Sequence, residues 1–215
     1  IFEKSFPEGS QMKKKRLLIK VFFLFLFSQL VYSQTDKQRE IADLLKIYEE
    51  NRLLNGSVLV AEKEEVLLSD GFGYANMEWK IENTPQTKFR IASITKQFTS
   101  MLVMQMVEEG KIELGAKITD YLPEYPSENG DKITIHHLLS HTSGMPHYAG
   151  IPEFFPRFSR QLFTHKDFMK LFWDLDLLFE PGTKFSYSSF GYYLLGIILE
   201  EISGKTYAEL LEEKI

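Results

Sequence analysis

Apolar residues return along this chain at two different spacings, and the spacing changes from one segment to the next. Over 36–50 they return every three or four residues, as on one face of an amphipathic helix. Over 56–76 short apolar runs flank the polar pair Lys63 and Glu64, a pattern that predicts two short strands joined by a tight turn. We therefore expect a helix and a strand pair in the first part of the chain.

Helical spacing dominates after the strands, and helix-capping residues accompany it. The stretch 94–109 predicts a helix, with Gly110 at the position of a left-handed C-terminal cap. One side of this helix is expected to carry Phe98, Met101, Leu102, Gln105 and Met106. A short helix is predicted in "ITIHHLL", and longer ones after Thr164, before Gly204 and after Thr206, each next to a capping residue.

Two strands do not make a stable sheet by themselves. An isolated two-stranded sheet is marginal in water, and the helix predicted after Thr206 has barely begun at Ile215. We therefore expect this chain to be the front portion of a longer domain, with the C-terminal strands of its sheet missing from it.

Composition places the chain among globular proteins. Of its 215 residues, 44% are hydrophobic and 26% are charged. The net charge of −5 shows no basic excess, so binding to nucleic acid is not expected. Because the chain has no cysteine, it has no disulfide, thiol nucleophile or thiolate metal ligand.

The segment 1–33 differs from the rest of the chain and predicts export. Met12 is followed by four basic residues and then by an apolar run over 17–32. This order is typical of a secretory signal peptide, and cleavage after Ser33 would leave Gln34 as the first residue. The mature protein would then be periplasmic or extracellular.

The alternative for this segment is an uncleaved inner-membrane anchor over 17–32. Lys20 interrupts that run, and the run is shorter than the roughly 20 apolar residues that a membrane span needs. Cleavage is therefore the favoured interpretation, and contact with a membrane is expected only if the segment stays in place. Residues 1–11 precede Met12, and we assign them no role.

Ser93 and Lys96 stand three residues apart, where an extended stretch gives way to a predicted helix. Residues i and i+3 share a helix face, so the lysine ammonium can reach the serine hydroxyl. Free N–H groups and the positive dipole end at a helix start suit a serine that becomes an acyl ester. The spacing alone is weak, because Ser10 and Lys13 also have it.

Lysine is a poor base unless its pKa falls. Lowering that pKa from about 10.4 to about 7 requires about 4 to 5 kcal/mol, whereas a helix dipole supplies about 0.3 to 1 kcal/mol. Burial and a second polar partner must supply the rest. Tyr187, followed by Ser188 and Ser189 ahead of an apolar helix, is the candidate, because a tyrosine beside an ammonium can accept the serine proton.

Three stretches of the chain together resemble one known family. They are "FRIASITKQF", "ITIHHLLSHTSGMP" and "PGTKFSYSSFGYYLLG", and their motifs and order are similar to those of the serine β-lactamase-related family. That family includes class C β-lactamases, D-alanyl-D-alanine carboxypeptidases and related esterases. The resemblance runs from about Gly56 to Ile215.

The resemblance implies an α/β (α+β) fold of the β-lactamase/transpeptidase type. In this fold an antiparallel sheet flanked by helices lies beside a helical domain. Within the partial domain 34–215, the first helix and two sheet strands would occupy 34–90, and most of the helical part would occupy 91–215.

The resemblance also implies a role for each motif residue. Ser93 would be the acylated nucleophile and its backbone N–H one oxyanion donor, with Lys96 as base or proton partner and Tyr187 as general base and acid. Ser189 stands where the family has asparagine in the substrate-binding motif, and it is shorter, with one donor instead of two. The "HTSG" of 141–144 is interpreted as structural, shaping a loop near the cleft.

One family motif does not occur in the chain. The family has a late Lys/His-Ser/Thr-Gly strand that binds the substrate carboxylate and supplies the second oxyanion N–H, and no such strand follows before Ile215. Losing one oxyanion donor costs on the order of 10² to 10³ in rate. We therefore expect this chain alone to be inactive and its longer parent to be active.

The predicted function is that of an exported serine hydrolase with an acyl-enzyme mechanism. Its partner would be a small-molecule or peptidoglycan-like substrate: a β-lactam, a D-alanyl peptide or a carboxylic ester. No cofactor is implied, and no metal, because His136, His137 and His141 lack a recognised metal-binding pattern. The alternative is a non-catalytic penicillin-binding-like sensor or muropeptide-binding protein of the same fold. The sequence does not predict an oligomeric state.

Overall fold

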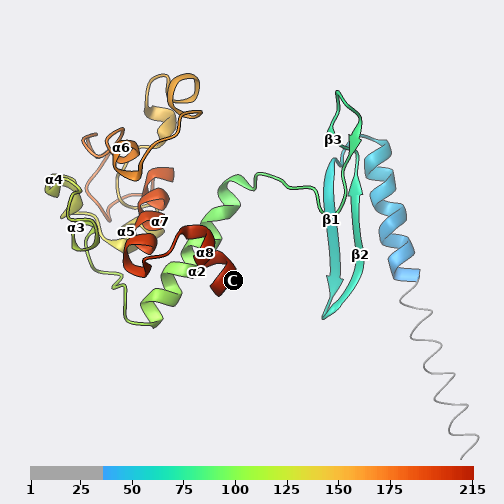
Figure 1. Cartoon of the computed structure of the whole chain (residues 1–215), viewed down its shortest axis with the longest axis horizontal. Helices are drawn as coiled ribbons and strands as arrows, with labels where there is room; N and C mark the ends of the chain where they lie inside the picture. The colour runs from blue at the N-terminus through green and yellow to red at the C-terminus, as the bar shows by residue number, and fades with distance from the viewer. Residues whose placement is uncertain (1–35) are drawn as a thin grey trace, which may run out of the picture. The chain divides into compact units, whose positions relative to one another are not determined.

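The structure, a computed structural model, describes residues 36–215. The predicted signal peptide and the alternative anchor lie outside the described residues. The chain forms two compact units that divide between Arg90 and Ile91 (Figure 1). Over 36–215, no helix has the length and apolar character needed to cross a membrane.

The first unit contains the predicted helix and hairpin. The helix covers 36–50. Strand β1 (Gly56–Glu62) pairs antiparallel with β2 (Glu65–Phe72) in a register that sets Glu62 opposite Glu65. Lys63 in the turn between them has a φ of 57°, which lets the chain reverse within two residues. The prediction of a helix and a strand pair is confirmed.

Two further strands follow that the apolar pattern does not predict. Strands β3 (Tyr74–Asn76) and β4 (Ile81–Glu82) pair antiparallel as a second small sheet. They have three and two residues, too few for a period-two alternation to show. Buried Asn83 ties the end of β4 to the hairpin, because its side-chain amide donates to the Phe72 carbonyl at 2.8 Å.

The second unit is helical and is built around two long helices, α2 (Thr95–Glu108) and α7 (Ser189–Ser203). Its shorter elements are η1 (Ala92–Ile94), α3 (Ile118–Tyr121), α4 (Ser127–Gly130), α5 (Ile135–Leu139), η2 (Tyr148–Gly150), the π-helical turn η3 (Phe154–Phe158), α6 (His165–Met169) and α8 (Tyr207–Lys214).

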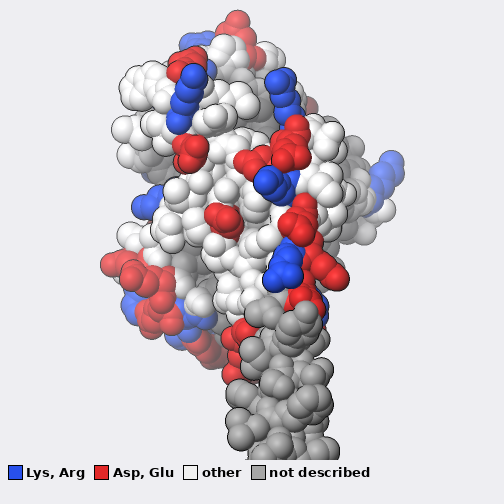
Figure 2. Space-filling model, turned by 90° about the vertical axis from the view of Figure 1, so that its right-hand side faces the viewer, with Lys and Arg blue, Asp and Glu red and all other residues white. Residues whose placement is uncertain are grey.

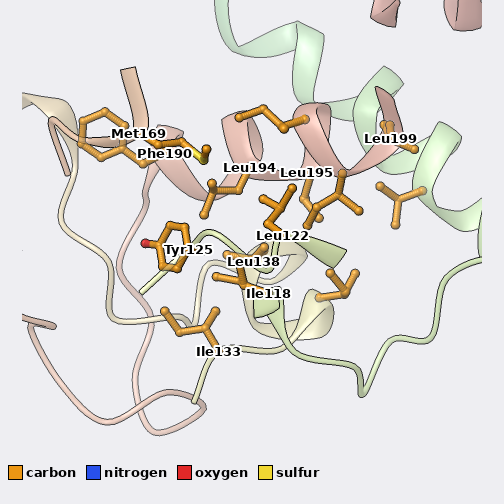
Figure 3. Packing of buried hydrophobic residues seen from close by; sticks show 14 of the residues in the cluster. Ile118, Leu122, Tyr125, Ile133, Leu138, Met169, Phe190, Leu194, Leu195 and Leu199 are labelled. Carbon is orange, nitrogen blue, oxygen red and sulfur yellow. The ribbon is translucent and has the colours of Figure 1, made fainter. Parts of the chain in front are cut away.

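Helix α7 lies at the centre of this unit. Seven of its residues are buried, and Leu194, Leu195 and Ile198 have no exposed surface. It contacts α2, α3, α5 and α8, and Figure 3 shows the apolar side chains that gather around it. Burial of one Leu or Ile side chain stabilises a fold by about 1.5–3 kcal/mol. The core therefore fixes α7 firmly, and with it the residues just before its first turn.

The buried face of helix α2 agrees with the predicted one in part, because Leu102 and Met106 are buried as expected. Its buried residues are Thr99, Leu102, Val103 and Met106, whereas Met101 is 54% exposed. The prediction is wrong for Met101, and it missed Thr99 and Val103, because the position of α7 decides which residues of α2 pack.

The predicted capping residues are confirmed. Gly110 and Gly204 adopt φ values of 71° and 65°, and the backbone N–H of Gly204 donates to the Glu200 carbonyl as the cap of α7. Thr206 opens α8 with a reciprocal capping box, and Thr164 caps α6. Helix α6 is shorter than the pattern predicted and ends at Met169, after which the apolar residues reach the core from turns.

Charged side chains contribute little to holding this fold together. Acidic and basic residues are interspersed on the face drawn in Figure 2. The ion pairs include Lys37 with Glu62 at 2.7 Å and Lys170 with Asp167 at 2.9 Å, and all four side chains are exposed. Exposed pairs of this kind are typically worth about 0–1 kcal/mol, so the apolar core carries most of the stability.

Candidate active site

Ser93 lies on a sharp bend that leads directly into α2. It is the middle residue of η1, and the N–H of Thr95 donates to the carbonyls of Ala92 and Ser93. Ala92 has a φ of 47°, a left-handed conformation that residues other than glycine rarely adopt. The bend leaves the Ser93 side chain exposed and places its N–H in the first helical turn, where N–H groups have no partner within the helix.

Tyr187 is the group that meets the Ser93 hydroxyl. The two side-chain oxygens lie 2.6 Å apart, although the residues are 94 positions apart in the sequence. Either oxygen can donate in this hydrogen bond. The tyrosine comes just before α7, so the central helix of the unit brings it to the start of α2.

Lys96 faces Tyr187 and Ser189. Its Nζ donates to the Ser189 hydroxyl at 3.4 Å and lies 4.9 Å from the centre of the Tyr187 ring. The four predicted site residues therefore come together, with hydrogen bonds between Ser93 and Tyr187 and between Lys96 and Ser189. The tyrosine lies beside the Ser93 hydroxyl, and the Lys96 ammonium lies next to the tyrosine ring.

The surroundings of Tyr187 favour its ionised form. Partial burial raises the pKa of the Tyr187 phenol, but the Lys96 ammonium and the Ser93 hydroxyl both favour the phenolate and outweigh burial. As a result the pKa of Tyr187 lies below its ordinary value of 10.0.

Ser189 is the first residue of α7 and is half-buried. Its side chain is shorter than that of the asparagine found at this position in the family motif, and it reaches the Lys96 Nζ only at the long distance of 3.4 Å. It restrains the ammonium with a weak hydrogen bond and leaves it directed towards the tyrosine.

A cavity of about 340 Å³ adjoins Lys96 and Ser189 between α2, α7 and α8. Its other lining residues are Thr95, Thr99, His165, Tyr192, Tyr193, Gly196, Ile197, Glu200 and Tyr207. Three of its eleven lining residues are tyrosines, and Ser93 and Tyr187 are not among the lining residues.

Two histidines that sequence reasoning did not place at the site lie beside Tyr187. The His141 ring centre is 4.5 Å from that of Tyr187, and the His147 ring centre is 5.3 Å from it. The "HTSG" motif was visible in the sequence, but its contact with the tyrosine depends on how two distant segments fold. Among residues 36–215, no group of three or more His, Cys, Asp or Glu is placed to hold a metal ion.

The family of the chain follows from comparison with known proteins. The sequence model of the Beta-lactamase family matches residues 37–215, and the chain belongs to this family. The expected β-lactamase/transpeptidase-like fold and the family resemblance are thus confirmed.

Three relatives show the extent of the similarity. Penicillin-binding protein 4* of Bacillus subtilis (strain 168) is 33% identical over 183 residues, which cover 84% of this chain and 40% of that protein. The crystal structure of a penicillin binding protein from Bacillus halodurans has 36% identity and a TM-score of 0.69, covering 79% of this chain and 51% of that one. EstCE1, a hydrolase with promiscuous acyltransferase activity, has 28% identity and a TM-score of 0.66. The match covers 85% of this chain and 51% of that one.

The chain therefore spans about half the length of the solved relatives and 40% of the Bacillus subtilis protein.

Proposed function

We propose that the protein is a serine hydrolase that cleaves an amide or ester through an acyl-enzyme on Ser93. The observation that carries this proposal is the 2.6 Å contact between the Ser93 hydroxyl and the Tyr187 phenol, with the Lys96 ammonium 4.9 Å from the centre of that ring. A nucleophile within hydrogen-bond reach of a base, which a third group holds in its active form, is the general arrangement for covalent catalysis.

In the first half of the reaction the phenolate of Tyr187 takes the Ser93 proton. The serine oxygen then attacks the substrate carbonyl carbon, and the carbonyl oxygen gains negative charge near the free N–H of Ser93. Tyr187 next gives its proton to the leaving nitrogen or oxygen, whose bond to the carbonyl carbon breaks. The products are an ester on Ser93 and a free amine or alcohol.

In the second half water takes the place of the leaving group. Tyr187 accepts a proton from the water, which attacks the ester, and the proton returns to the Ser93 oxygen as the acid leaves. The Lys96 ammonium stabilises the phenolate, and Ser189 limits the movement of the ammonium.

The relatives support amide or ester as the substrate class. EstCE1 is described as a hydrolase with acyltransferase activity, and a 28% identical solved structure is a D-amino acid amidase from Ochrobactrum anthropi SV3. Both activities are acyl transfers from a carbonyl carbon, as in the proposed mechanism. The penicillin-binding relatives add a β-lactam as a candidate substrate, and the family resemblance adds a D-alanyl peptide.

We also propose that the protein is exported through residues 12–33. The support is the basic and apolar order of that segment. N-terminal sequencing of the exported protein is expected to begin at Gln34, whereas an intact start at Met12 would contradict cleavage.

Labelling by a serine-reactive probe tests the nucleophile. The full-length protein is treated with a fluorophosphonate or a penicillin, and the modified peptide is identified by mass spectrometry. We expect the adduct on Ser93, with labelling and hydrolysis lost in Ser93→Ala. The matched control is Ser69→Ala, which removes an exposed hydroxyl from β2 and should label like the wild type.

Two outcomes would contradict this assignment. Undiminished hydrolysis in Ser93→Ala would place the nucleophile elsewhere. Absence of any adduct on an intact Ser93, together with tight non-covalent binding of the penicillin, would favour the sensor or binding protein of the same fold.

A further inference from the structure

Two hydrogen bonds to one histidine bracket Tyr187 in the chain. The N–H of Ser186 donates to the His141 carbonyl at 2.9 Å, and the N–H of Ser188 donates to the His141 Nδ1 at 3.2 Å. The residues immediately before and after the tyrosine are thus held by the same residue, although Ser188 is 47 positions away from it in the sequence.

The imidazole ring also holds the phenol ring itself. His141 lies between two tyrosines, with ring centres 4.5 Å from Tyr187 and 5.0 Å from Tyr192 and small tilts of 36° and 34°. Tyr192 is a fixed support, because its OH donates to the Leu139 carbonyl at 2.9 Å and lies 3.0 Å from the Ser100 hydroxyl. The phenol ring of Tyr187 is therefore in tilted contact with an imidazole that is itself in contact with the fixed ring of Tyr192.

Tyr187 needs such support because its own segment has no regular structure. Residues 185–188 form neither helix nor strand, and Phe185 in this segment is 69% exposed. A loop without a ladder of backbone hydrogen bonds is positioned only by individual contacts. The contacts of His141 are the ones that act on both neighbours of Tyr187 and on its ring.

We propose that His141 is the positioning residue that holds the Tyr187 phenol against Ser93, and that it does so as the neutral tautomer with its proton on Nε2. The proposal rests on the proposed role of Tyr187 as base and acid. The tautomer follows from the hydrogen bond: Nδ1 accepts from the N–H of Ser188 and so cannot carry a proton itself.

The charges around the imidazole favour this neutral form. The His141 ring is surrounded by four groups: Lys96 on α2, His147 in the loop after α5, and the phenols of Tyr187 and Tyr192. Burial lowers the pKa of His141, and the Lys96 ammonium and His147 lower it further. Protonation at low pH would turn Nδ1 from an acceptor into a donor that faces another donor, and the bond from Ser188 would be lost.

The wild-type protein offers a test with an internal control. The Ser186 amide donates to a carbonyl, which does not titrate, whereas the Ser188 amide donates to a nitrogen that does. In hydrogen-exchange NMR we expect both amides to be protected at neutral pH. Protection of Ser188 should fall as His141 becomes protonated, while that of Ser186 stays. Equal pH dependence of the two amides, or ¹⁵N shifts that show a proton on Nδ1 at neutral pH, would overturn the proposal.

Two substitutions of His141 connect this positioning role to catalysis in the full-length protein. His141→Asn keeps an acceptor near the Nδ1 position and tolerates the φ of 56° found here, whereas His141→Ala keeps neither. Misplacing a reacting group by about 1 Å can cost on the order of 10²-fold, so we expect kcat to fall by about that factor in His141→Ala with little change in KM. The kcat of His141→Asn should be at least about tenfold higher than that of His141→Ala. Exposed His136→Ala is the control and should leave kcat unchanged.

The titration of Tyr187, followed through labelled tyrosine carbons, separates this proposal from the proposed function. In His141→Ala the midpoint should rise towards the ordinary tyrosine value, and in His141→Asn it should stay near that of the wild type. If Ser93→Ala remains active, the proposed catalytic scheme is wrong. The Tyr187 titrations in the His141 variants would still test whether His141 positions the phenol. An unchanged Tyr187 midpoint and kcat in His141→Ala, or equal losses in both variants, would overturn it.

Discussion

Replacing Gly144 by alanine tests whether the loop 141–144 fixes the segment that leads to Tyr187. Gly144 has a φ of 77°, and a Cβ built on it would lie 2.3 Å from the carbonyl oxygen of Phe179. Its own carbonyl accepts from the N–H of Leu178 at 2.8 Å. The loop and the segment therefore touch backbone to backbone, and a methyl group has no room between them.

Two costs add up in Gly144→Ala. Holding alanine in the left-handed conformation costs about 1–2 kcal/mol, and forcing the Phe179 backbone away costs about 1–3 kcal/mol, as overpacking does in other proteins. The expected loss is about 2–5 kcal/mol, a large part of the 5–15 kcal/mol typical of a folded domain. Gly110→Ala is the matched control, because Gly110 has a φ of 71° but a Cβ there would meet no neighbouring atom of the described residues within 4 Å.

Urea denaturation measures both variants. We expect Gly110→Ala to lose only the conformational cost of about 1–2 kcal/mol, with Gly144→Ala losing more at an unchanged m-value. Equal losses in the two variants would refute the argument that backbone contact at Phe179 makes glycine necessary at position 144.

Three further predictions concern the rest of the second unit. Thr206→Ala should lower stability by about 1 kcal/mol in urea denaturation because it removes the cap of α8, whereas Thr206→Ser should stay close to the wild type. Phe172→Ala should lower the free energy of unfolding by about 3–5 kcal/mol in thermal or urea unfolding, since its ring is buried and stacked on that of Phe190, with the ring centres 4.1 Å apart. Replacing the exposed Phe155 by alanine should lower it far less. The ion pairs of Glu109 with Lys111 and Lys214 lower its pKa to about 2, so the stability that this carboxylate gives is complete above its ordinary value of 4.5 and is lost as pH falls towards 2. Glu109→Gln should therefore flatten the dependence of the urea midpoint on pH in this window, and an unchanged slope would contradict the assignment.

Features set by neighbours in the sequence could be predicted well. The capping box of Thr206 and Glu209 and the left-handed cap at Gly204 involve residues within one helical turn, so the pattern that predicts them also contains the interaction. The hairpin around Lys63 is local in the same sense.

Features set by distant contacts could not be predicted from local patterns, and the meeting of Ser93 and Lys96 with Tyr187 and Ser189 was predicted only through the family resemblance. The buried face of α2 depends on where α7 packs, and both sides of α2 carry residues that can be buried. Strands β3 and β4 are too short to show a period. The resemblance placed the loop 141–144 near the cleft, but it did not indicate that His141 contacts Tyr187.

The arrangement of the site also changes which residue has to be activated. A lysine base would need its pKa lowered at a cost of about 4 to 5 kcal/mol, which the start of α2 cannot supply. The structure instead sets the phenol of Tyr187 beside Ser93, with the Lys96 ammonium next to the ring. The positive charge of the Lys96 ammonium then stabilises the phenolate form of Tyr187. In this arrangement Lys96 does not have to lose its proton to act. Lys96→Met, which keeps the length of the side chain without its charge, should therefore raise the midpoint of the Tyr187 titration and slow acylation of Ser93. A Tyr187 midpoint that does not move in this variant would show that the ammonium is not what lowers it.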